Sequence, residues 1–388
     1  MLRLVVVIPD RISEILQKGE YSGRYYNPGE IFDEVHILMT NDDRPDLGVL
    51  QKTVGRARLF LHNIHAGKRL FLKSIFWRPP LLKKWARGGV SIAARIKPNL
   101  IRCHGNHLNA FLASEIKQEL GVPYIVSMHI NPDEDVRKRA HSWMGMLASR
   151  ASVDMEKISI NNADLVIPVY KPILPYLRRL GATKIELIYN VINPVHLRKK
   201  ENYDLHDPVQ IVSVGRVFRE KYPINLIKAL KGLNVELAVI GDGPQFSDLQ
   251  RDTAEAGMTG NVRFIPAIPN DQLCGLLSDF DIFATHSEYF EVSKSVLEPL
   301  LTGLPVVLNK RIGEPVPEFQ EGDFLLLVEN SVEGYRTAIE KLITDHAFRE
   351  NLGRAAYTHA WRNWNPAKME AKYVGVYRRV MESTGEQS

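Results

Sequence analysis

Residues 210–216, QIVSVGR, and residues 235–244, VELAVIGDGP, contain the pattern on which the fold depends. In each of them a run rich in apolar and β-branched residues ends in a glycine. Such runs are typical of parallel strands that are buried on both faces. A glycine at the end lets the chain turn sharply and approach a ligand or a neighbouring loop closely. The two stretches therefore predict strands that lead into tight turns.

Similar runs recur along the whole chain, and stretches with helical spacing separate them. We expect strands at residues 4–8, 34–39, 100–103, 123–128, 164–169, 210–214, 235–240, 262–265, 281–285, 305–309 and 324–328. The clearest helix is predicted at 107–120, where apolar residues recur every three or four positions and Gly121 follows as the stop. Alternation of strand and helix predicts an α/β fold with parallel sheets.

A stretch at 195–208 that is rich in charge and poor in apolar residues divides the chain. We predict two doubly wound, Rossmann-like domains at 1–195 and 209–365, a linker at 196–208, and a ligand cleft between the domains. Residues 366–388 are predicted to form a C-terminal helix with Met369, Tyr373 and Tyr377 on one stripe. That helix either stays with the second domain or crosses back to the first.

The composition excludes several classes of protein. Of the 388 residues, 45% are hydrophobic and 24% are charged, which is ordinary for a globular chain. Two cysteines, Cys103 and Cys274, cannot build a disulfide framework, and they favour a reducing compartment, which predicts the cytoplasm. No apolar run approaches the roughly 20 residues of a membrane helix, and we expect no export signal.

Basic residues gather in one segment, although the net charge of +5 is modest. Residues 68–97 contain no acidic residue and carry the cations Lys68, Arg69, Lys73, Arg78, Lys83, Lys84, Arg87, Arg95 and Lys97. Phe71, Phe76, Trp77 and Trp85 lie among them. Cations interleaved with aromatic residues suit an anionic membrane surface, which predicts a peripheral membrane contact. A solvated basic face is the main alternative, and nucleic acid is the least favoured partner.

Two cations follow the strand at 210–214. Gly215 and Arg216 end it, and Lys221 follows in the next loop, shortly before the helix that Pro223 opens. Carboxyl ends of parallel strands face the ligand crevice in a doubly wound domain. A guanidinium and an ammonium that converge there suit a diphosphate. The alternative is a solvated loop in which Arg216 pairs with Glu220.

The turn Gly241-Asp242-Gly243-Pro244 is not a dinucleotide fingerprint, because the third glycine and the acidic residue about 20 positions later are missing. Further on, a polar loop leads into a helix whose first turn is predicted at Ser293, Lys294 and Ser295. Free N–H groups at such a helix start can bind phosphate. Glu298, in the apolar part of this helix, can accept hydrogen bonds from ribose hydroxyls; a helix-surface glutamate is the alternative.

Taken together, these residues resemble the family 4 glycosyltransferases, which are retaining enzymes with the GT-B fold. The family's pattern of strand, Gly-Arg, Lys and Leu-Ile-x-Ala is present as Gly215-Arg216, Lys221 and residues 226–229. Its Ile-Gly-x-Gly-Pro corresponds to residues 240–244. Its later motifs correspond to Val262-Arg263-Phe264, Asp281, Phe283, Ser287, Leu297-Glu298 and residues 303–307.

The resemblance implies a role for each of these positions. It implies that Arg216 and Lys221 bind the donor diphosphate, that Glu298 binds the ribose, and that the backbone at Phe264 and Ile265 contacts the base. In the N-terminal half the match is looser. There His129 is similar to the family's sugar-contacting histidine, and Gly19 lies where the family has its acceptor loop, although the usual paired glycines are absent.

One position departs from the family pattern. The family has two glutamates eight positions apart, whereas eight positions before Glu298 lies Phe290. Glu291 is expected to present the carboxylate to the donor sugar, with Glu288 as the alternative. A loss of turnover is the further alternative.

No metal or cofactor is expected. Cys103, His104 and His107 lie close in sequence, but a strand end that leads into a helix explains them better than a metal site. Asp279 and Asp281 have the Asp-x-Asp spacing of metal-dependent transferases with another fold, but Asp281 begins a predicted buried strand.

The sequence thus predicts transfer of a sugar from a nucleoside-diphosphate sugar to a hydroxyl of a lipid-linked or cell-surface saccharide. Two alternatives stay open: a nucleotide-sugar-binding protein without turnover, and a nucleotide-sugar epimerase of the same fold. The donor base, the sugar, the linkage and the oligomeric state are not determined by the sequence.

Overall fold

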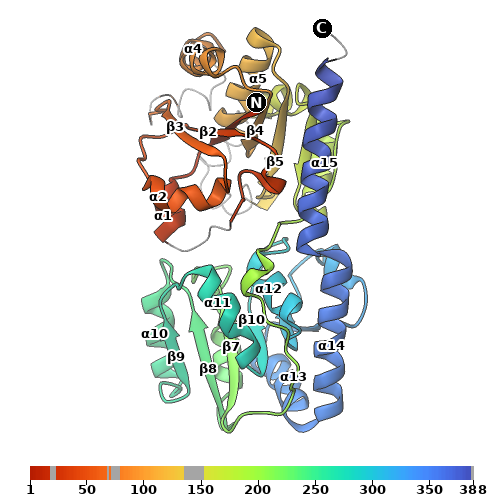
Figure 1. The fold of residues 1–388 in the computed structure, drawn as a ribbon. Helices are drawn as coiled ribbons and strands as arrows, with labels where there is room; N and C mark the ends of the chain where they lie inside the picture. The colour runs from red at the N-terminus through yellow and green to blue at the C-terminus, as the bar shows by residue number, and fades with distance from the viewer. Residues whose placement is uncertain (18–22, 68–69, 71–78, 135–152, 386–388) are drawn as a thin grey trace. The chain divides into compact units, whose positions relative to one another are not determined.

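A computed structural model of the chain describes residues 1–17, 23–67, 70, 79–134 and 153–385. These residues form two compact units (Figure 1). The described parts of 1–191 together with 367–385 make up the first unit, and Ile192–Pro366 is the second. Gly19 and the cations Lys68, Arg69, Lys73 and Arg78 of the basic segment lie outside the described residues, as do Phe71, Phe76 and Trp77.

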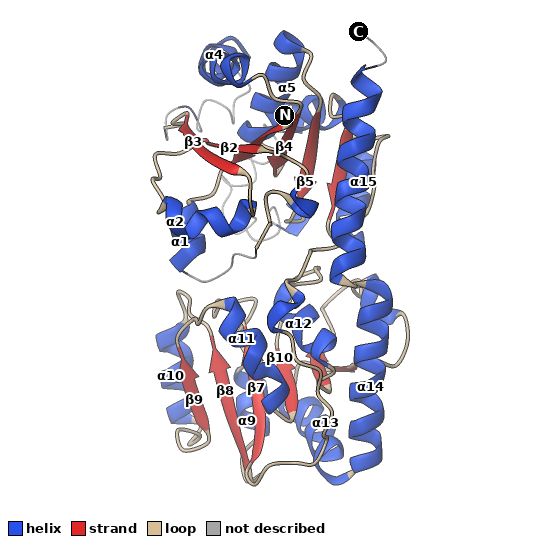
Figure 2. Cartoon of the chain, in the orientation of Figure 1, coloured by secondary structure: helices blue, strands red, loops and turns tan. Residues whose placement is uncertain are grey.

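The first unit is built on a six-stranded parallel sheet with the order β3-β2-β1-β4-β5-β6. Figure 2 shows β3, β2, β4 and β5 of this sheet in red. Its strands are β1 (Arg3–Ile8), β2 (Glu34–Met39), β3 (Arg58–Asn63), β4 (Leu100–His104), β5 (Tyr124–Met128) and β6 (Leu165–Pro168). Its described helices include α1 (Ile12–Gln17), α2 (Leu47–Leu50), α4 (Pro79–Ile96), α5 (Leu108–Leu120), α8 (Leu174–Arg179) and α15 (Pro366–Gly385). The strand order reverses between β1 and β4, so the sheet is doubly wound.

Both faces of this sheet are buried at its central strands. On β1, Leu4, Val6 and Ile8 pack into one core cluster, and the intervening Val5 and Val7 are fully buried on the other face. The C-terminal helix α15 contributes Met369, Tyr373, Val376 and Tyr377 to the cluster of the first face. Its apolar stripe is therefore buried in the first unit, against strands that lie far earlier in the chain.

A buried arginine in β4, Arg102, contacts this helix. Arg102 is 2% exposed; its Nε donates to Ser127 Oγ (3.2 Å) and its Nη1 donates to the carbonyl of Tyr25 (3.1 Å). The guanidinium lies 4.8 Å from the ring centroid of Tyr373 on α15. Hydrogen bonds and aromatic faces thus compensate a charge that would otherwise be costly to bury.

The second unit repeats the same topology. Its parallel sheet has the order β12-β11-β10-β7-β8-β9. The strands are β7 (Val209–Val214), β8 (Val235–Ile240), β9 (Val262–Ile265), β10 (Ile282–Thr285), β11 (Val306–Asn309) and β12 (Leu326–Val328). The helices are α9 (Ile224–Ala229), α10 (Phe246–Glu255), α11 (Asn270–Leu276), α12 (Lys294–Thr302), α13 (Val332–Thr344) and α14 (His346–Asn363). Here the order reverses between β7 and β10.

The predicted fold class is confirmed, and every predicted strand is present. One strand was not expected: β3 lies at the edge of the first sheet, where it alternates between exposed and partly buried residues, so it lacks the continuous apolar run of its neighbours. The segment 196–208 extends along the second unit. There the Lys200 N–H donates to the carbonyl of Thr302 (2.8 Å) and the Tyr203 hydroxyl donates to that of Gly303 (2.9 Å).

No helix among the described residues is long and apolar enough to cross a membrane.

Backbone contacts join the loops that follow β7 and β8. The Val217 N–H donates to the carbonyl of Asp242 (2.7 Å), and the Gly215 N–H donates to that of Ile240 (3.0 Å). A Cβ on Gly241 would lie 2.1 Å from the carbonyl oxygen of Gly215, and one on Gly243 would lie 2.2 Å from that of Val217. Both glycines are therefore required by the close approach of the neighbouring loop.

We expect Tyr377→Ala to destabilise the first unit by about 3–5 kcal/mol, because it removes a fully buried ring between α15 and the sheet and leaves a cavity. The midpoint of urea unfolding measures the loss. Arg378→Ala removes an exposed side chain from the same helix and should unfold like the unsubstituted protein. Equal midpoints for the two variants would contradict the packing described for α15.

We expect Gly243→Ala to destabilise the second unit by about 1–3 kcal/mol, because the new methyl group overlaps the backbone of Val217. Thermal unfolding measures this effect. Gly260→Ala is the matched control, since its methyl group would meet nothing within 4 Å. If Gly243→Ala has the same melting temperature as the control, the two loops do not depend on this contact.

Candidate active site

The candidate site lies at the carboxyl edge of the second sheet, where the loops after β7, β10, β11 and β12 meet. In doubly wound sheets, ligands bind outside the carboxyl ends of the strands at the point where the strand order reverses. That point lies between β7 and β10 in this unit. The first of these loops carries Arg216 and Lys221, and the second carries Glu288 and Glu291.

Arg216 is exposed, and its guanidinium makes no ion pair with Glu220 or with any other residue that the structure describes. Its neighbour Val217 is 2% exposed and anchors the loop in the core of the unit. Gly215 precedes it with a φ of +153°, and a Cβ there would meet nothing within 4 Å. The backbone around Arg216 is thus held in place while its side chain and the space beside Gly215 stay open.

Lys221 and Glu291 form the contact that joins the two loops. Lys221 Nζ donates to Glu291 Oε1 at 2.7 Å, and both side chains are about one-fifth exposed. The ammonium also lies 5.2 Å from the ring centroid of Tyr289. The backbone supports the pair, because the Glu288 N–H donates to the carbonyl of Glu220 (2.8 Å). Two residues that the sequence predicted separately are therefore in direct contact.

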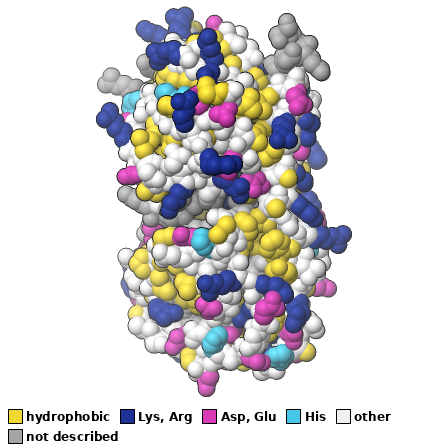
Figure 3. All heavy atoms as spheres, in the orientation of Figure 1, with side chains coloured by type: hydrophobic (Ala, Val, Ile, Leu, Met, Phe, Trp, Pro, Cys, Tyr) yellow, Lys and Arg dark blue, Asp and Glu magenta, His cyan; other side chains and the backbone are white. Residues whose placement is uncertain are grey.

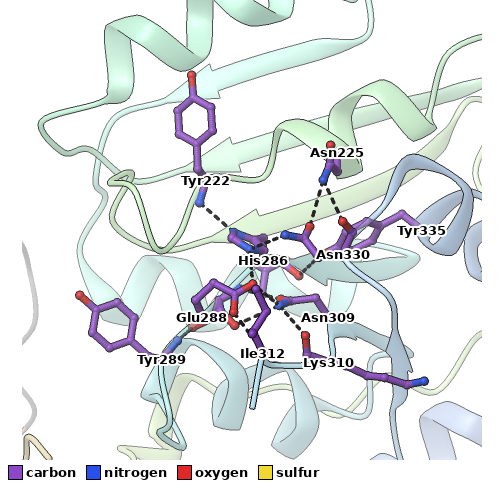
Figure 4. A network of polar contacts seen from close by, with 12 residues as sticks. Tyr222, Asn225, His286, Glu288, Tyr289, Asn309, Lys310, Ile312, Asn330 and Tyr335 are labelled. Atoms are coloured by element: carbon purple, nitrogen blue, oxygen red, sulfur yellow. Dashed lines mark hydrogen bonds and ion pairs between the residues drawn. The ribbon is translucent and has the colours of Figure 1, made fainter. Parts of the chain in front are cut away.

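Residues that neighbour this pair in sequence belong to a polar network around His286 (Figure 4). His286 accepts a hydrogen bond from the Tyr222 N–H (3.0 Å) and contacts Glu288 Oε1 (3.1 Å). Glu288 also accepts from Asn309 Nδ2 (3.2 Å) and from the Ile312 N–H (3.3 Å). These bonds use both carboxylate oxygens of Glu288 inside the protein.

Glu291 instead lines a cavity of about 220 Å³ within the second unit. The cavity walls also include Ser293, Asn309, Arg311 and Gln320. At the departure from the family pattern, the Phe290 ring is covered by the Arg311 guanidinium, 4.6 Å from its centroid. Arg311 Nη1 donates to the carbonyls of Ile312 (3.0 Å) and Glu314 (3.1 Å), so it also braces its own loop.

The helix α12 starts at the predicted place. Ser293 is its N-cap residue, and no side chain caps the helix; the Ser293 and Ser295 hydroxyls lie 3.1 Å apart. The first N–H groups of a helix have no partner within the helix, and a phosphate bound at a helix start accepts hydrogen bonds from such groups. Glu298 is 2% exposed and accepts a hydrogen bond from Asn270 Nδ2 (2.8 Å), which rules out a helix-surface glutamate.

Phe264 and Ile265 end β9, at the same edge of the sheet. Phe264 is partly exposed and its ring contacts that of Phe246, with centroids 5.6 Å apart. The carbonyl of Ile265 accepts from the Gly241 N–H (3.0 Å). The order of the loops along this edge therefore runs from Glu291 through Arg216 to Phe264.

His129 follows β5 in the first unit. Its Nδ1 lies 3.2 Å from Asn190 Oδ1, and its ring stacks on that of His104 with centroids 5.2 Å apart. Tyr25 lies at the same edge, 6.4 Å from the His129 ring. The carboxyl edge of the first sheet thus carries its own group of aromatic and imidazole side chains.

Cys103 and Asp281 come from the two stretches that the sequence analysis weighed as metal sites. Burial raises the pKa of the Cys103 thiol to about 12, and its Sγ–H lies 3.3 Å from the carbonyl oxygen of Gly105. Asp281 is 1% exposed and accepts from the Gln210 N–H (2.8 Å) and from the His206 N–H (3.2 Å). Over the described ranges, no group of three or more His, Cys, Asp and Glu residues is arranged to hold a metal ion.

Sequence reasoning missed His286, Asn309 and Arg311. His286 was detectable in part, because a histidine directly after a buried strand lies at the ligand edge. Asn309 and Arg311 follow β11 in the same way. Their partners come from other loops, and no local spacing predicts those contacts.

Two family models match the chain. The model for glycosyl transferases group 1 matches residues 197–359, and that for glycosyltransferase family 4 matches residues 33–196. The sulfoquinovosyl transferase SQD2 of Arabidopsis thaliana is 28% identical over 346 residues. That alignment covers 84% of this chain and 63% of the relative, so the chain spans less than two thirds of that protein.

Solved structures with the same fold cover nearly the whole chain. Sucrose-phosphate synthase from Thermosynechococcus elongatus has a TM-score of 0.75 at 18% identity and covers 99% of this chain and 100% of its own. HepE from Anabaena, solved in complex with UDP-glucose, has a TM-score of 0.72 at 14% identity and covers 98% and 100%. With the matched models, the repeated doubly wound sheet and the motifs at its carboxyl edge, the chain belongs to the family 4 glycosyltransferases of the GT-B fold.

Proposed function

We propose that this protein transfers a sugar from a nucleoside-diphosphate sugar to an acceptor hydroxyl, with retention at the anomeric carbon and without a metal ion. The observation that carries the proposal is the contact between Lys221 and Glu291, which joins the loops after β7 and β10. It brings a cation suited to a diphosphate within hydrogen-bond distance of a carboxylate suited to sugar hydroxyls.

The reaction needs fixed positive charge more than it needs a reactive side chain. As the bond between the anomeric carbon and the diphosphate oxygen breaks, its electron pair moves to that oxygen. Arg216, Lys221 and the first N–H groups of α12 would stabilise this charge in the transition state more than in the ground state. The open guanidinium of Arg216 supports this role, because no protein carboxylate competes for it among the described residues.

Retention follows if the acceptor attacks from the same face as the departing diphosphate. In that step the acceptor oxygen bonds to the anomeric carbon, and its proton passes to the departing phosphate oxygen. This scheme requires no protein nucleophile. A double displacement through a carboxylate is the alternative that the chemistry allows.

Glu291 is the proposed contact for the donor sugar. Its carboxylate lines the cavity and is partly exposed, whereas Glu288 is occupied by His286, Asn309 and the backbone of Ile312. When the diphosphate binds, Lys221 can turn toward it and leave Glu291 free for hydroxyl groups. His129, with its ring held by His104 and Asn190, is proposed to contact the sugar as well.

Glu298 is the proposed partner of the ribose hydroxyls. Burial of its carboxylate beside Asn270 makes a hydrogen-bonded ligand favourable there, because a buried carboxylate accepts several hydrogen bonds. The backbone at Phe264 and Ile265 is proposed to contact the base. A uracil nucleotide is the first donor to test, since HepE was solved with UDP-glucose.

The acceptor is proposed to be lipid-linked, presented by an anionic membrane surface to which the protein binds peripherally. The described part of the basic segment forms α4, which buries Leu82, Ala86 and Ala93 against the unit. Its cations Lys84, Arg87 and Arg95 are exposed, and Figure 3 shows basic side chains gathered over α4. Each cation near anionic headgroups is worth about 1 kcal/mol.

We expect Arg216→Ala and Lys221→Ala each to lower kcat by about 100- to 1,000-fold, because each removes a cation from the departing diphosphate. Steady-state rates with UDP-, GDP- and ADP-sugars measure the effect, and the anomeric configuration of the product tests retention. Lys228→Ala, which removes an exposed cation from α9, is the matched control. Rates like those of the control in either variant would remove the diphosphate assignment.

We expect the protein to sediment with anionic vesicles at low salt and to be released at high salt. The double variant Lys84→Ala/Arg87→Ala should bind about 30-fold more weakly, from about 1 kcal/mol for each lost cation. Lys228→Ala/Lys231→Ala removes two exposed cations from the second unit and should leave binding unchanged. If the protein stays in the supernatant at low salt, or if both double variants bind alike, α4 is not the membrane contact.

A further inference from the structure

His286 lies at the centre of the polar network and touches three loops at once (Figure 4). Its Nδ1 faces the Tyr222 N–H at 3.0 Å, in the loop after β7. Its Nε2 lies 3.1 Å from Glu288 Oε1 and 3.1 Å from Asn330 Nδ2, which belongs to the loop after β12. The residue is 5% exposed, so its bonds to Tyr222 and Glu288 replace the hydrogen bonds that water would make.

One tautomer fits the contacts with Tyr222 and Glu288. Asn330 Nδ2 is itself a donor, so it lies beside Nε2 without bonding to a proton there. A backbone N–H can only donate, so Nδ1 must carry a lone pair to accept from Tyr222. A neutral imidazole then has its proton on Nε2, which donates to the carboxylate of Glu288. Protonation of Nδ1 would place two N–H groups face to face and break the bond to the Tyr222 loop.

The surroundings of the ring favour the neutral form. Burial lowers the pKa of His286 from its ordinary value of 6.5, although the carboxylate of Glu288 opposes the shift. Glu288 is the charged group that faces the ring. From α13, Tyr335 donates its hydroxyl to the carbonyl of Thr285 (2.9 Å), and burial raises its pKa, so it stays neutral. The loop after β7 presents the Tyr222 N–H to the ring, and the loop after β12 presents the uncharged Nδ2 of Asn330.

The two bonds of His286 act on the proposed site through its neighbours. Tyr222 directly follows Lys221, so the bond to Nδ1 holds the turn that aims the ammonium. Glu288 lies three residues before Glu291, and its own N–H is bonded to the carbonyl of Glu220 in the Lys221 turn. His286 therefore holds the backbone on both sides of the Lys221–Glu291 pair through Tyr222 and Glu288. It contacts neither Lys221 nor Glu291 in these bonds.

We propose that His286 is a positioning residue that must be neutral, with its proton on Nε2, for Lys221 and Glu291 to hold the donor. The inference rests on the proposed function. It predicts that acidification disables the site when Nδ1 takes up a proton, since the Lys221 turn is then released. The folded state also loses stability as the pH falls below 6.5, because the unfolded chain binds that proton first.

Two neutral substitutions separate the two bonds. His286→Asn can place an amide oxygen near Nδ1 and so keep an acceptor for the Tyr222 N–H. His286→Gln can place an amide donor near Nε2 and so keep the bond to Glu288, but it offers no acceptor at Nδ1. Both remove the titrating group, and both introduce an amide into the same cavity, so each is the control for the other.

For the unsubstituted protein we expect kcat/KM for the donor to fall about tenfold per pH unit below the pKa of His286. At pH 7.5 the His286→Asn variant should keep kcat within about threefold, whereas His286→Gln should lose about tenfold or more. The acid limb assigned to His286 should be absent from the profile of His286→Asn. Equal rates for the two variants, or an unchanged acid limb in His286→Asn, would overturn the proposal.

A measurement without turnover separates this proposal from the proposed function. In the full chain, ¹⁵N NMR of His286 should report a proton on Nε2 and a pKa below 6.5. Hydrogen exchange of the Tyr222 amide should accelerate as the pH falls through that pKa, after correction for the intrinsic exchange rate. A proton on Nδ1, or an amide whose protection ignores the titration, would overturn the positioning role even if sugar transfer is observed. The expected pattern in a protein that transfers no sugar would support the bond network while defeating the enzymatic function.

Discussion

The close backbone contact between the loops after β7 and β8 is the constraint on which the candidate site depends. Gly241 and Gly243 leave no room for a side chain because the carbonyls of Gly215 and Val217 occupy that space. The contact forces the chain after β7 to leave the sheet in one direction, which keeps Arg216 at the open edge. Since β7 and β10 are neighbours at the reversal of strand order, the turn with Lys221 then meets the loop after β10.

Electrostatic interactions within the protein orient the cations of the candidate site. Fixed positive charge stabilises a departing diphosphate only if little reorganisation is needed when the bond breaks. Lys221 is held by Glu291, and the loops on both sides are joined by the buried bonds of His286 and Glu288. Arg216 is held only through its backbone. Lys221 is thus oriented by a carboxylate, which in the proposed function the donor would replace, and Arg216 remains open to solvent.

Particular residues mark how far the sequence could predict this structure. The buried strands were found because both of their faces must be apolar, and the start of α12 at Ser293 followed from the change in pattern there. The edge strand β3 was not predicted, because half of its residues are exposed and it has no continuous apolar run. The sequence favoured Glu291 and kept Glu288 as the alternative, because both lie near Phe290 and spacing does not show the partners of either carboxylate. The partners that occupy Glu288 come from β11 and from the end of β10.

The order of apolar runs and glycines by itself determined the two parallel sheets, their doubly wound class and the edge at which the candidate site residues gather. Those features depend on periodicity and on the lack of a side chain, which are local properties of the chain. Only the tertiary structure decided that α15 is buried in the first unit, that Glu291 rather than Glu288 faces the cavity, and that His286 joins three loops. Each of those outcomes depends on a partner far away in the chain. Burial removes water from these groups, so the hydrogen bonds and apolar contacts of that partner determine which arrangement is stable.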